Sequence, residues 1–557
     1  MKDHASARVA VVGNGPVGQT TALLLARWGI PVTLLDARPE RDPIGSKAIC
    51  QQRDVLDVWE AVGVGKRIAD EGLTWTTART FYRDRELFSH TLPDPGQSCF
   101  PPFVNISQAR TEELLDERIA AEPLIDVRWG HFVTAIHQDG AGRAGPAGTG
   151  TGVRLLCTTA AGDVEVSADY VVACAGARAE EIRHELGVSF DGHSFDDRFL
   201  ICDIHAELPG WSHERRFYFD PRWNPGRQVL IHPCPDSTYR IDWQVPGDYD
   251  LDAEEASGAL DARIRAIIGE VPYEIVWKSV YRFHSRVVDR MRVGRVLLAG
   301  DCAHLVAPFG ARGLNSGVAD AENAAWKLAF VLHGWSGEEL LESYHDERHA
   351  AAVENLDVTT ATMDFLVPHN DAQLRRRLSV LERAADDPAA WSDVDSGRLA
   401  EPFWYAASPL TTPDPTRPFA GRPARGTVPA AGPGILVPDV PVSVAGAVCS
   451  RFRELARNGF VLLAAPGVDL PAVRDAAVES TGAPVRVLEL VAIDSTGALA
   501  DALAARHGEL WVIRPDAHVA AVVAHPAKAD VAAVLGRAMG SDATRKEAHD
   551  GVLPAGR

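Results

Sequence analysis

The N-terminal segment constrains the fold of this chain more than any other part of the sequence. Apolar runs at residues 8–12 and 32–35 are typical of buried strands, and residues 16–28 between them have the pattern of a helix. Three glycines in the spacing G-x-G-x-x-G separate the first strand from the helix: Gly13, Gly15 and Gly18. A strand, a glycine turn and a helix in this order predict a parallel βαβ unit whose helix N-terminus binds phosphate.

Each residue of this motif has a physical task. Gly13 permits the tight turn, Gly15 lets the backbone approach a pyrophosphate, and Gly18 lets the helix pack on the sheet. Pro16 suits the first helical turn, because its missing N–H would have no partner there. Asp36 ends the second strand, where a carboxylate can accept ribose hydroxyls. The motif predicts a dinucleotide site without separating NAD from FAD.

Two distant segments share the style of the first. Residues 168–177 and 295–308 each contain a buried strand that runs into glycine, and the second is followed by a helical pattern from about 315 to 333. We expect the three pieces to form one nucleotide-binding domain. Between them, apolar and polar residues alternate strictly, which predicts a second domain built on a sheet with one buried face. The alternation sets Tyr239, Ile241 and Trp243 against Arg240, Asp242 and Gln244.

Composition breaks set the remaining boundaries. Residues 407–445 are rich in Pro, Gly, Ala and Thr, and residues 141–152 have the composition of a flexible loop at a hairpin tip. We expect a nucleotide-binding domain at 1–80, 105–188 and 282–400, a sheet domain at 81–104 and 189–281, a linker at 401–445 and a small α/β domain at 446–557.

The bulk composition excludes several classes of partner. The chain of 557 residues carries 76 acidic and 56 basic residues, a net charge of −20 that repels nucleic acid and anionic membranes. It contains no apolar run of about 18 residues and no secretory signal, so we expect a cytoplasmic protein. None of the eight cysteines forms C-x-x-C, so we expect reduced thiols and no metal site.

A second motif points to the cofactor. Asp301 follows a buried strand and Gly300, and a carboxylate there can hold a sugar-alcohol chain such as ribityl. Pro308 and the glycines after it form a loop whose backbone can approach a flat ring. The next helix directs its N-terminus at that ring, where free N–H groups would stabilise the negative charge of reduced flavin. The residues expected to supply them are Gly313, Leu314 and Asn315.

On these residues the chain resembles the class A flavoprotein hydroxylases, the para-hydroxybenzoate hydroxylase superfamily. Within it, the chain is most similar to the branch of 3-(3-hydroxyphenyl)propionate, pentachlorophenol and phenol hydroxylases. The resemblance covers residues 7–360, and residues 400–557 more weakly resemble the thioredoxin-like C-terminal domain of that branch. The matching residues are Gly300, Asp301, Cys302, Ala303, His304, Pro308, Asn315, Ser316, Gly317, Asp320, Ala321, Trp326, Lys327, Leu328, Tyr344, Glu347 and Arg348.

The resemblance implies a fold and an activity. The fold is α/β: a Rossmann-like FAD-binding domain, an inserted substrate-binding β-sheet domain, and a C-terminal thioredoxin-like domain that is redox-silent and structural or forms a homodimer. The implied activity hydroxylates a phenolic or polycyclic small molecule with non-covalent FAD, NADH or NADPH, and O2, through a flavin C4a-hydroperoxide. Further cofactor contacts are implied at Ala37, Arg38, Lys47, Gln108, Arg110 and Gly176.

The chain departs from the family pattern beside Gly176. Ala175 stands where the family has an Asp that serves both FAD and the nicotinamide, and one residue is inserted before Arg183. Either a neighbouring group supplies the contact, or NAD(P)H is handled differently. Arg312 replaces the usual Gln, and there it would either meet an anionic substrate or adjust the charge at the flavin.

The expected contacts of the reacting ring come from the loop at Pro308 and from the sheet domain. Pro308 shapes one side of the ring, and the expected polar contacts of the sheet domain are His232, Tyr239, Arg240, Tyr281 and His284. We expect His284, Tyr239 and Tyr281 to be the catalytic candidates, and His232, Arg240 and Arg312 to bind substrate. Baeyer–Villiger oxygen insertion and a flavoprotein reductase or flavin-binding protein stay open as alternatives. Alanine-rich, arginine-rich and lysine-poor usage is typical of a GC-rich genome, and by analogy with similar enzymes of such genomes we expect a role in the tailoring of aromatic secondary metabolites.

Overall fold

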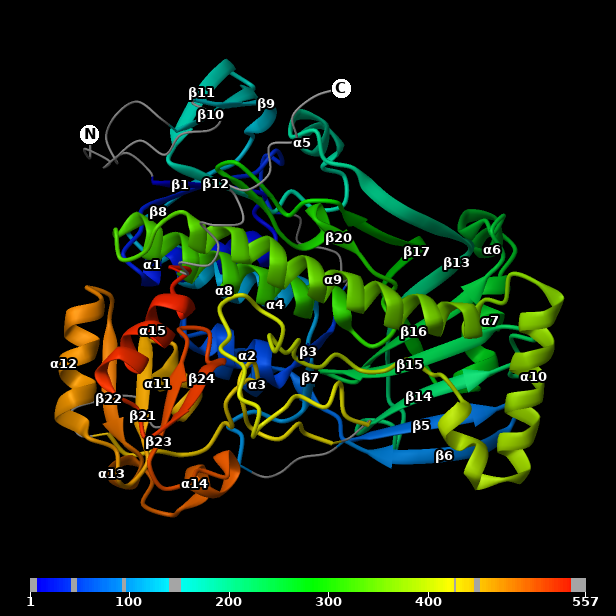
Figure 1. The fold of residues 1–557 in the computed structure, drawn as a ribbon. Coiled ribbons are helices and arrows are strands. Elements are labelled where there is room, and N and C mark those ends of the chain that lie inside the picture. The colour runs from blue at the N-terminus through cyan, green and yellow to red at the C-terminus, as the bar shows by residue number, and fades with distance from the viewer. Residues whose placement is uncertain are drawn as a thin grey trace, which may run out of the picture.

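The computed structural model describes residues 8–41, 48–92, 97–139, 152–424, 427–444 and 451–541. Its first layer is a six-stranded sheet in the order β18-β19-β12-β1-β2-β8 (Figure 1). The central strands are parallel, and only the edge strand β18 is antiparallel to its neighbour. The strands are β1 (Val9–Val12), β2 (Val32–Leu35), β8 (Ile125–Arg128), β12 (Tyr170–Ala173), β18 (Arg292–Val293) and β19 (Val296–Leu298).

Helices cover this sheet. The predicted βαβ unit is confirmed, because β1, α1 (Pro16–Arg27) and β2 follow one another with the two strands parallel. Residues 18–26 of α1 are all buried, as expected for a helix packed between a sheet and a second helix. That second helix is α8 (Arg312–Leu332), which begins three residues before the predicted start at Asn315. The other helices and short segments of this part are α2 (Arg53–Glu60), α3 (Gly65–Glu71), α4 (Gln108–Ala120), α5 (Glu180–Glu185) and η1 (Gly300–Cys302).

Two small sheets flank the first. One has the order β11-β10-β9, with β9 and β10 paired antiparallel as in a hairpin. The predicted flexible tip between them falls mostly outside the described residues. The other joins β3, β7 and β4. The strands are β3 (Cys50–Gln52), β4 (Leu73–Thr74), β7 (Phe103–Asn105), β9 (Phe132–Gln138), β10 (Val153–Thr159) and β11 (Gly162–Ala168).

The second layer is an eight-stranded sheet in the order β20-β17-β13-β16-β15-β14-β5-β6. Its strand β5 begins at residue 77 and its strand β17 ends at residue 288, so these strands extend past the domain boundaries expected at 81 and 281. One face packs on helix α7 (Ala259–Ile268), next to α6 (Leu251–Ala256). The strands are β5 (Thr77–Tyr82), β6 (Arg85–Thr91), β13 (Phe190–Ala206), β14 (Glu214–Phe219), β15 (Gln228–Cys234), β16 (Thr238–Val245), β17 (Tyr273–Val288) and β20 (His304–Leu305).

The long helix α9 (Glu339–Leu366) runs across the molecule from the first layer towards α10 (Asp371–Asp386), which stands at the outer end of the second sheet (Figure 1). A short 3-10 turn, η2 (Pro388–Asp393), follows α10. Residues 401–424 and 427–444, expected as a linker, have irregular backbone but bury Tyr405 and Leu410. This segment is therefore packed against the rest of the molecule along part of its length.

The C-terminal part is a separate four-stranded sheet in the order β22-β21-β23-β24, with only β21 and β22 parallel. It packs on α8, because Trp326 and Phe330 of that helix share one core cluster with Phe460 and Leu462. The elements are α11 (Phe452–Ala456), β21 (Phe460–Ala464), α12 (Leu470–Ser480), β22 (Val485–Glu489), α13 (Leu490–Ile493), α14 (Ala498–Leu503), β23 (Glu509–Ile513), β24 (Val519–Ala524) and α15 (Lys528–Ala538).

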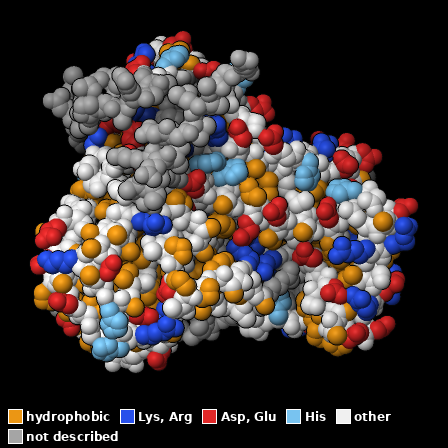
Figure 2. All heavy atoms as spheres, viewed as in Figure 1, with side chains coloured by type: hydrophobic (Ala, Val, Ile, Leu, Met, Phe, Trp, Pro, Cys, Tyr) orange, Lys and Arg blue, Asp and Glu red, His pale blue; other side chains and the backbone are white. Residues whose placement is uncertain are grey.

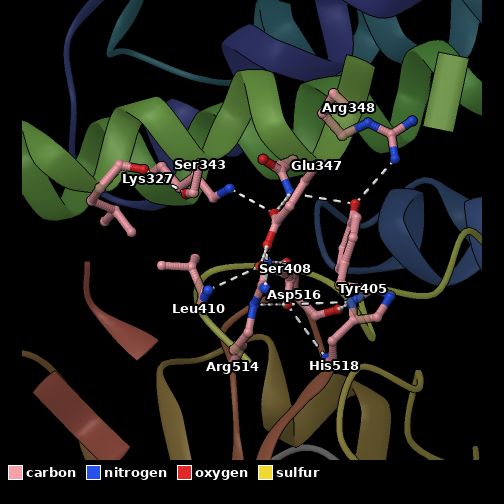
Figure 3. A network of polar contacts seen from close by, with 12 residues as sticks. Lys327, Ser343, Glu347, Arg348, Tyr405, Ser408, Leu410, Arg514, Asp516 and His518 are labelled. Atoms are coloured by element: carbon pink, nitrogen blue, oxygen red, sulfur yellow. Dashed lines mark hydrogen bonds and ion pairs between the residues drawn. The ribbon is translucent and has the colours of Figure 1, made fainter. Parts of the chain in front are cut away.

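A buried ion network joins the C-terminal part to α8 and α9 (Figure 3). Glu347 of α9 accepts hydrogen bonds from Lys327 Nζ at 2.6 Å and from Arg514 at 2.6 and 3.0 Å. Arg514 also donates to Asp516 at 2.6 Å. The side chains of all four residues are at most 2% exposed. Because each charge is paired and hydrogen-bonded, the network can persist in the interior and fix how the C-terminal part sits.

Two further features concern possible contacts with membranes and nucleic acids. None of their helices is both long and apolar enough to cross a membrane. On the face drawn in Figure 2, acidic and basic side chains are interspersed over the coloured residues, and no extended basic patch gathers there.

Candidate cofactor and substrate site

A cavity of about 770 Å³ lies between the two large sheets. Its floor is formed by the ends of β1, β2, β12 and β19 and by the segment from Pro308 to Asn315. Its roof is formed by side chains of β13, β14, β15, β16 and β17. The position at the carboxyl ends of parallel strands is where open α/β sheets bind nucleotides.

The glycine turn at the floor has the geometry that the motif predicts. Gly13 has φ +109°, and a Cβ there would lie 2.3 Å from the Cys174 carbonyl oxygen. A Cβ on Gly18 would lie 1.8 Å from the Gly13 carbonyl oxygen, so this glycine is needed for helix packing. A Cβ on Gly15 would meet no atom within 4 Å, because Gly15 and Pro16 face the cavity. The turn thus leaves an open cradle at the N-terminus of α1, which fits a pyrophosphate.

Asp36 is held rigidly at the end of β2. Its carboxylate accepts the Asn14 backbone N–H at 2.7 Å, the Arg38 backbone N–H at 2.9 Å and the Arg38 side chain at 2.9 and 3.0 Å. Burial alone would raise the pKa of Asp36, but these hydrogen bonds lower it below its usual range. Asp36, Ala37 and Arg38 all line the cavity, so an ionised carboxylate faces it at the end of β2.

Asp301 lines the cavity on the other side of the glycine turn. The turn before it is fixed by buried Asp320, which accepts the Gly300 backbone N–H at 2.9 Å. Asp320 in turn pairs with His304 at 2.7 Å and with Arg348 at 2.7 Å. Arg348 belongs to the same buried layer as the network of Figure 3, where it donates to Tyr405 at 3.0 Å. The position of Asp301 is therefore set by packed and paired groups rather than by a free loop.

The segment from Pro308 to Asn315 and the first turn of α8 line the middle of the cavity. The backbone N–H groups of Gly313, Leu314 and Asn315 belong to that first turn, where a helix has no internal acceptors for them. The side chain of Asn315 is already used: it donates to the Cys50 carbonyl at 2.9 Å and accepts the Gln52 N–H at 3.0 Å. Only its backbone can act towards a ligand.

Arg312 corrects one expectation. Its side chain is 2% exposed and donates to Asn355 at 2.7 Å and to the carbonyls of Arg398 and Leu399 at 3.2 Å. Burial lowers its pKa to about 10. Arg312 contributes to the cavity wall, but its guanidinium holds the chain at 398–399 against α8, and this use leaves it unsuited to the predicted role of binding an anionic substrate.

The two residues of α4 that were predicted to contact the flavin point in different directions. Gln108 lines the cavity and accepts the Ala48 backbone N–H at 3.1 Å. Arg110 points away from it and pairs with Glu71 at 2.7 Å and with Glu113 at 2.9 Å, so its predicted flavin contact is corrected. Residues two apart on a helix differ by about 200° in direction, and only one of them can face a given site. Lys47, the other predicted contact nearby, lies outside the described residues.

The residues predicted to contact the substrate lie on two opposite faces of the roof sheet. His232 and Arg240 are cross-strand partners on β15 and β16, and both line the cavity. Arg240 forms a two-pronged ion pair with Asp203 at 2.7 and 2.8 Å. Burial and the neighbouring arginines hold the pKa of His232 well below its usual range, so it is neutral at neutral pH. Tyr239 lies on the opposite face, in the core against α7, which corrects its prediction as a catalytic residue.

Neither Tyr281 nor His284 is among the residues that line the cavity. His284 points to the other face of β17 from Phe283, and its Nδ1 lies 2.7 Å from Ser194 Oγ. Tyr281 shares the face of Phe283 but stands further along the strand, where its ring packs 6.3 Å from Trp277. Both predictions of a catalytic contact are thus corrected by strand register.

The sequence reasoning missed several residues of the roof. Asp242 follows Arg240 by two positions, so strand alternation places both on the cavity face. Arg215 of β14 is 4% exposed and lines the same wall. The remainder of the roof is apolar and aromatic: Phe199, Ile201, Leu230 and Phe283, with Phe309 of the floor segment packed against Phe199 and Phe283. The strand residues among these could have been predicted from the alternation of side chains along each strand, once one residue on the cavity face was known.

The segment that lacks the family Asp also reaches the cavity. Ala175 and Gly176 line it, together with Arg178 and Glu181. Arg183 is buried behind them and donates to the Cys302 carbonyl at 3.2 Å and to the Ala177 carbonyl at 3.0 Å. This arginine ties the loop after β12 to the loop after β19 and so holds the backbone next to Ala175.

Comparison with known proteins identifies the family of this site. The chain matches the family described as FAD binding domain over residues 6–359, more than half of its length, and it belongs to that family. A 3-(3-hydroxy-phenyl)propionate/3-hydroxycinnamic acid hydroxylase of Mycolicibacterium gilvum is 30% identical over 397 residues, 70% of this chain and 65% of the relative. One of the same name from Klebsiella pneumoniae is 29% identical over 64% of this chain and 62% of the relative. The matches span less than two thirds of these relatives.

Solved structures show the same fold over nearly the whole chain. The flavin-dependent monooxygenase PieE, in complex with FAD and substrate, has a TM-score of 0.82 at 24% identity, covering 97% of this chain and 100% of that one. The ternary complex of aklavinone-11 hydroxylase with FAD and aklavinone has a TM-score of 0.72 at 23% identity, with the same coverage. The predicted family resemblance and the predicted fold class are confirmed. FAD is the cofactor that the family and the floor of the cavity both fit.

Replacing Asp301 with alanine is expected to weaken the FAD complex by roughly 10- to 150-fold. Hydrogen bonds to a charged acceptor contribute about 1.5–3 kcal/mol, and each 1.4 kcal/mol is about tenfold in affinity. Titration of the apoprotein with FAD, followed by flavin fluorescence, measures the change. Asp70→Ala, on the exposed side of α3, is the matched control and should leave the affinity unchanged. An unchanged affinity in Asp301→Ala would show that its carboxylate does not contact the cofactor.

Proposed function

We propose that the protein is an FAD-dependent monooxygenase that uses NADH or NADPH and O2 to hydroxylate a phenolic or polycyclic aromatic molecule. The observation that carries this proposal is the single cavity whose floor is the dinucleotide site and whose roof is aromatic with a few buried polar groups. An apolar pocket with a small number of placed polar groups is typical of a small-molecule site. The hydroxylase names of the relatives and of the solved structures support the same activity.

The residues that would hold FAD are those of the floor. The N-terminus of α1 at Gly15 would take the pyrophosphate, Asp36 the adenosine ribose and Asp301 the ribityl chain. Bound FAD supplies the redox chemistry that connects NAD(P)H to O2. The first turn of α8, at Gly313 and Leu314, presents N–H groups that would stabilise negative charge on a bound flavin ring.

The roof sets the conditions for oxygen transfer to a ring. Phe199, Phe283 and Phe309 lie within 4.4–6.2 Å of one another by ring centroid and form a continuous aromatic surface. Such a surface favours a flat aromatic substrate and keeps water from the reacting atoms. His232 and Arg240 are the polar groups of the roof that the sequence predicted, and they would orient the substrate.

The direct test is substrate-stimulated oxidation of NADH and NADPH by the FAD-loaded protein across a panel of phenols and polycyclic aromatics. A hydroxylase should oxidise the cofactor faster with at least one phenol, with consumption of O2 and formation of a hydroxylated product. A product with oxygen inserted next to a carbonyl would indicate Baeyer–Villiger chemistry instead. Oxidation that no aromatic compound stimulates, with all O2 released as H2O2, would favour a flavoprotein reductase and contradict the proposal.

Ala175 leads to a prediction about the reductive half of the cycle. Ala175→Asp is expected to speed anaerobic flavin reduction by NAD(P)H by about tenfold, because it restores an acceptor on the cavity wall worth about 1.4 kcal/mol. Stopped-flow mixing at the flavin absorption band gives the rate. The rate of reaction with O2 should change much less.

The control for this prediction is the nearest carboxylate on the same segment. Glu181 lines the cavity from α5 and is the acidic side chain of residues 174–182 that does so. If Glu181→Gln slows flavin reduction while Ala175→Asp changes nothing, then Glu181 has taken over the missing contact. Rapid reduction of the wild-type protein, unchanged by either substitution, would refute the account of Ala175.

A further inference from the structure

Asp242 is a carboxylate on the cavity roof that the hydroxylase resemblance does not use. It lies on β16 between Ile201 of β13 and Leu230 of β15, its direct cross-strand neighbours. All three side chains line the cavity. The Oδ1 atom of Asp242 is buried and has no hydrogen-bond partner within the described residues. A buried carboxylate oxygen without a partner costs free energy, so its presence in a cavity indicates a ligand donor.

Asp242 is surrounded by both positively and negatively charged groups. Burial raises its pKa to about 7, and Arg240 and Arg215 oppose the rise. Arg240 is engaged in its two-pronged ion pair with Asp203, and Arg215 donates to the Ser396 carbonyl at 3.4 Å. His232 Nδ1 is a second buried polar atom without a partner in the described structure. The titratable and charged groups that face Asp242 are Asp203 of β13, Arg215 of β14, His232 and Cys234 of β15, and Arg240 of β16.

We propose that Asp242 is the acid–base residue of this site: its carboxylate accepts the hydrogen bond of a phenolic hydroxyl and takes the proton. This inference rests on the proposed function and adds that the substrate is a phenol. The phenolic O–H bond breaks, its electron pair stays on the substrate oxygen, and the proton moves to Asp242. Negative charge then lies on the phenolate, in a roof that also contains Arg215 and Arg240.

The chemistry explains why a carboxylate with these surroundings suits the task. A phenolate is more electron-rich than a phenol, so proton removal favours attack on an electrophilic oxygen, which is hydroxylation. A general base acts best when it is ionised at the working pH yet basic enough to attract the proton. An exposed Asp is ionised but weakly basic, with a pKa near 3.9. Burial between Ile201 and Leu230 makes Asp242 a stronger base and keeps it ionised above neutral pH.

The test uses the FAD-loaded protein without NAD(P)H, so that it reads binding and not turnover. The probes are 2-naphthol and 2-methoxynaphthalene, which share one ring system and differ by the methyl group that replaces the hydroxyl proton, so only 2-naphthol can donate a hydrogen bond. We expect the wild-type protein to bind 2-naphthol roughly 10- to 100-fold tighter at pH 8. The carboxylate form exists above pH 7, so this preference should be lost as pH falls through about 7. Perturbation of the flavin absorption spectrum reports both affinities.

Two variants decide the outcome. Asp242→Asn keeps the shape of the side chain and an oxygen that accepts a hydrogen bond, but it cannot ionise or take the proton, so it should reduce the preference and remove its pH dependence. Asp196→Asn, an exposed residue of β13 in the same sheet, is the matched control and should retain both. FAD content and the melting temperature show that each variant is folded, and Asp242→Glu should recover part of the preference if Asn perturbs packing. In turnover, Asp242→Asn should lower kcat about 100-fold and shift its pH profile.

A preference for 2-naphthol that keeps its pH dependence in Asp242→Asn would overturn the assignment of Asp242. Failure of the wild-type protein to bind either probe would contradict a phenol site in this cavity. The proposed monooxygenase function fails by a different observation, namely the absence of any aromatic compound that stimulates NAD(P)H oxidation, and the binding experiment does not depend on it.

Discussion

Replacing Glu347 with alanine is expected to destabilise the protein by about 3–5 kcal/mol, because the substitution leaves two buried cations without their shared counter-charge. Lys327 lies 2.6 Å from Glu347, and Arg514 lies 2.6 Å from it (Figure 3). All three side chains are fully buried, so water cannot replace the lost carboxylate. Arg514 belongs to the C-terminal part, and we expect its docking on α8 and α9 to be lost first.

Urea unfolding of the FAD-loaded protein measures this effect. Glu342→Ala is the matched control on the same helix, because its side chain is 60% exposed and its pair with Arg292 should contribute less than about 1 kcal/mol. Equal losses of stability in the two variants would contradict the role given to the buried network.

The same residue gives a pH dependence. Burial alone would raise the pKa of Glu347, but Arg514 and Lys327 hold it well below its usual range. Its stabilising contribution is therefore complete above the ordinary Glu pKa of about 4.3, and it is lost as pH falls towards the pKa in the folded state. Glu347→Gln should be less stable than wild type at neutral pH, and the difference between them should shrink on acidification.

Gly18→Ala is expected to abolish FAD loading, whereas Gly15→Ala should only weaken it. A Cβ at Gly18 would lie 1.8 Å from the Gly13 carbonyl oxygen, so the turn must move by more than a core can absorb. A Cβ at Gly15 would meet no protein atom within 4 Å, and its φ of −95° suits alanine. That methyl group would instead occupy the cradle that fits the pyrophosphate.

The two glycine variants can be separated by measuring folding and cofactor binding together. Gly15→Ala should keep the melting temperature of the apoprotein and lower its FAD affinity by at least about tenfold. Gly18→Ala should lower the melting temperature of the apoprotein itself, because the clash should reduce the free energy of unfolding by about 1–3 kcal/mol or more. A fully FAD-loaded Gly18→Ala protein would show that the turn is not as tightly packed as the structure has it.

The floor of the site could be predicted from the sequence because local spacing determines it. Gly13, Gly15 and Asp36 occur within one strand-turn-helix-strand unit, so their separation along the chain fixes their separation in space. The Gly300-Asp301 turn is similarly local, and it lines the cavity where the sequence places it. Among the predicted floor residues that the structure describes, the side chains of Arg110 and Arg312 take other directions than expected, because the sequence does not tell which direction a long side chain takes from a helix.

The roof could be predicted only in part, because strand register decides it. The alternation around Arg240 already placed Tyr239 and Asp242 on opposite faces of the strand. Tyrosine and histidine were nevertheless predicted as catalytic groups, because their side-chain chemistry suits proton transfer. His284 was chosen by its place in the chain, yet the pairing of β17 with β13 turns it away from Phe283. Which of the two sheet faces meets the cofactor depends on how the domains pack, and no local signal carries that information.

The central claim is that O2 chemistry at FAD is directed at an aromatic ring in this cavity, and oxygen isotope labelling tests it most directly. The FAD-loaded protein is supplied with NAD(P)H, ¹⁸O2 and the phenol that best stimulates NAD(P)H oxidation, and the product is analysed by mass spectrometry. The account predicts one ¹⁸O atom in a new ring hydroxyl and the other in water. A product without ¹⁸O, or complete conversion of ¹⁸O2 to labelled H2O2 with every phenol tried, would contradict it.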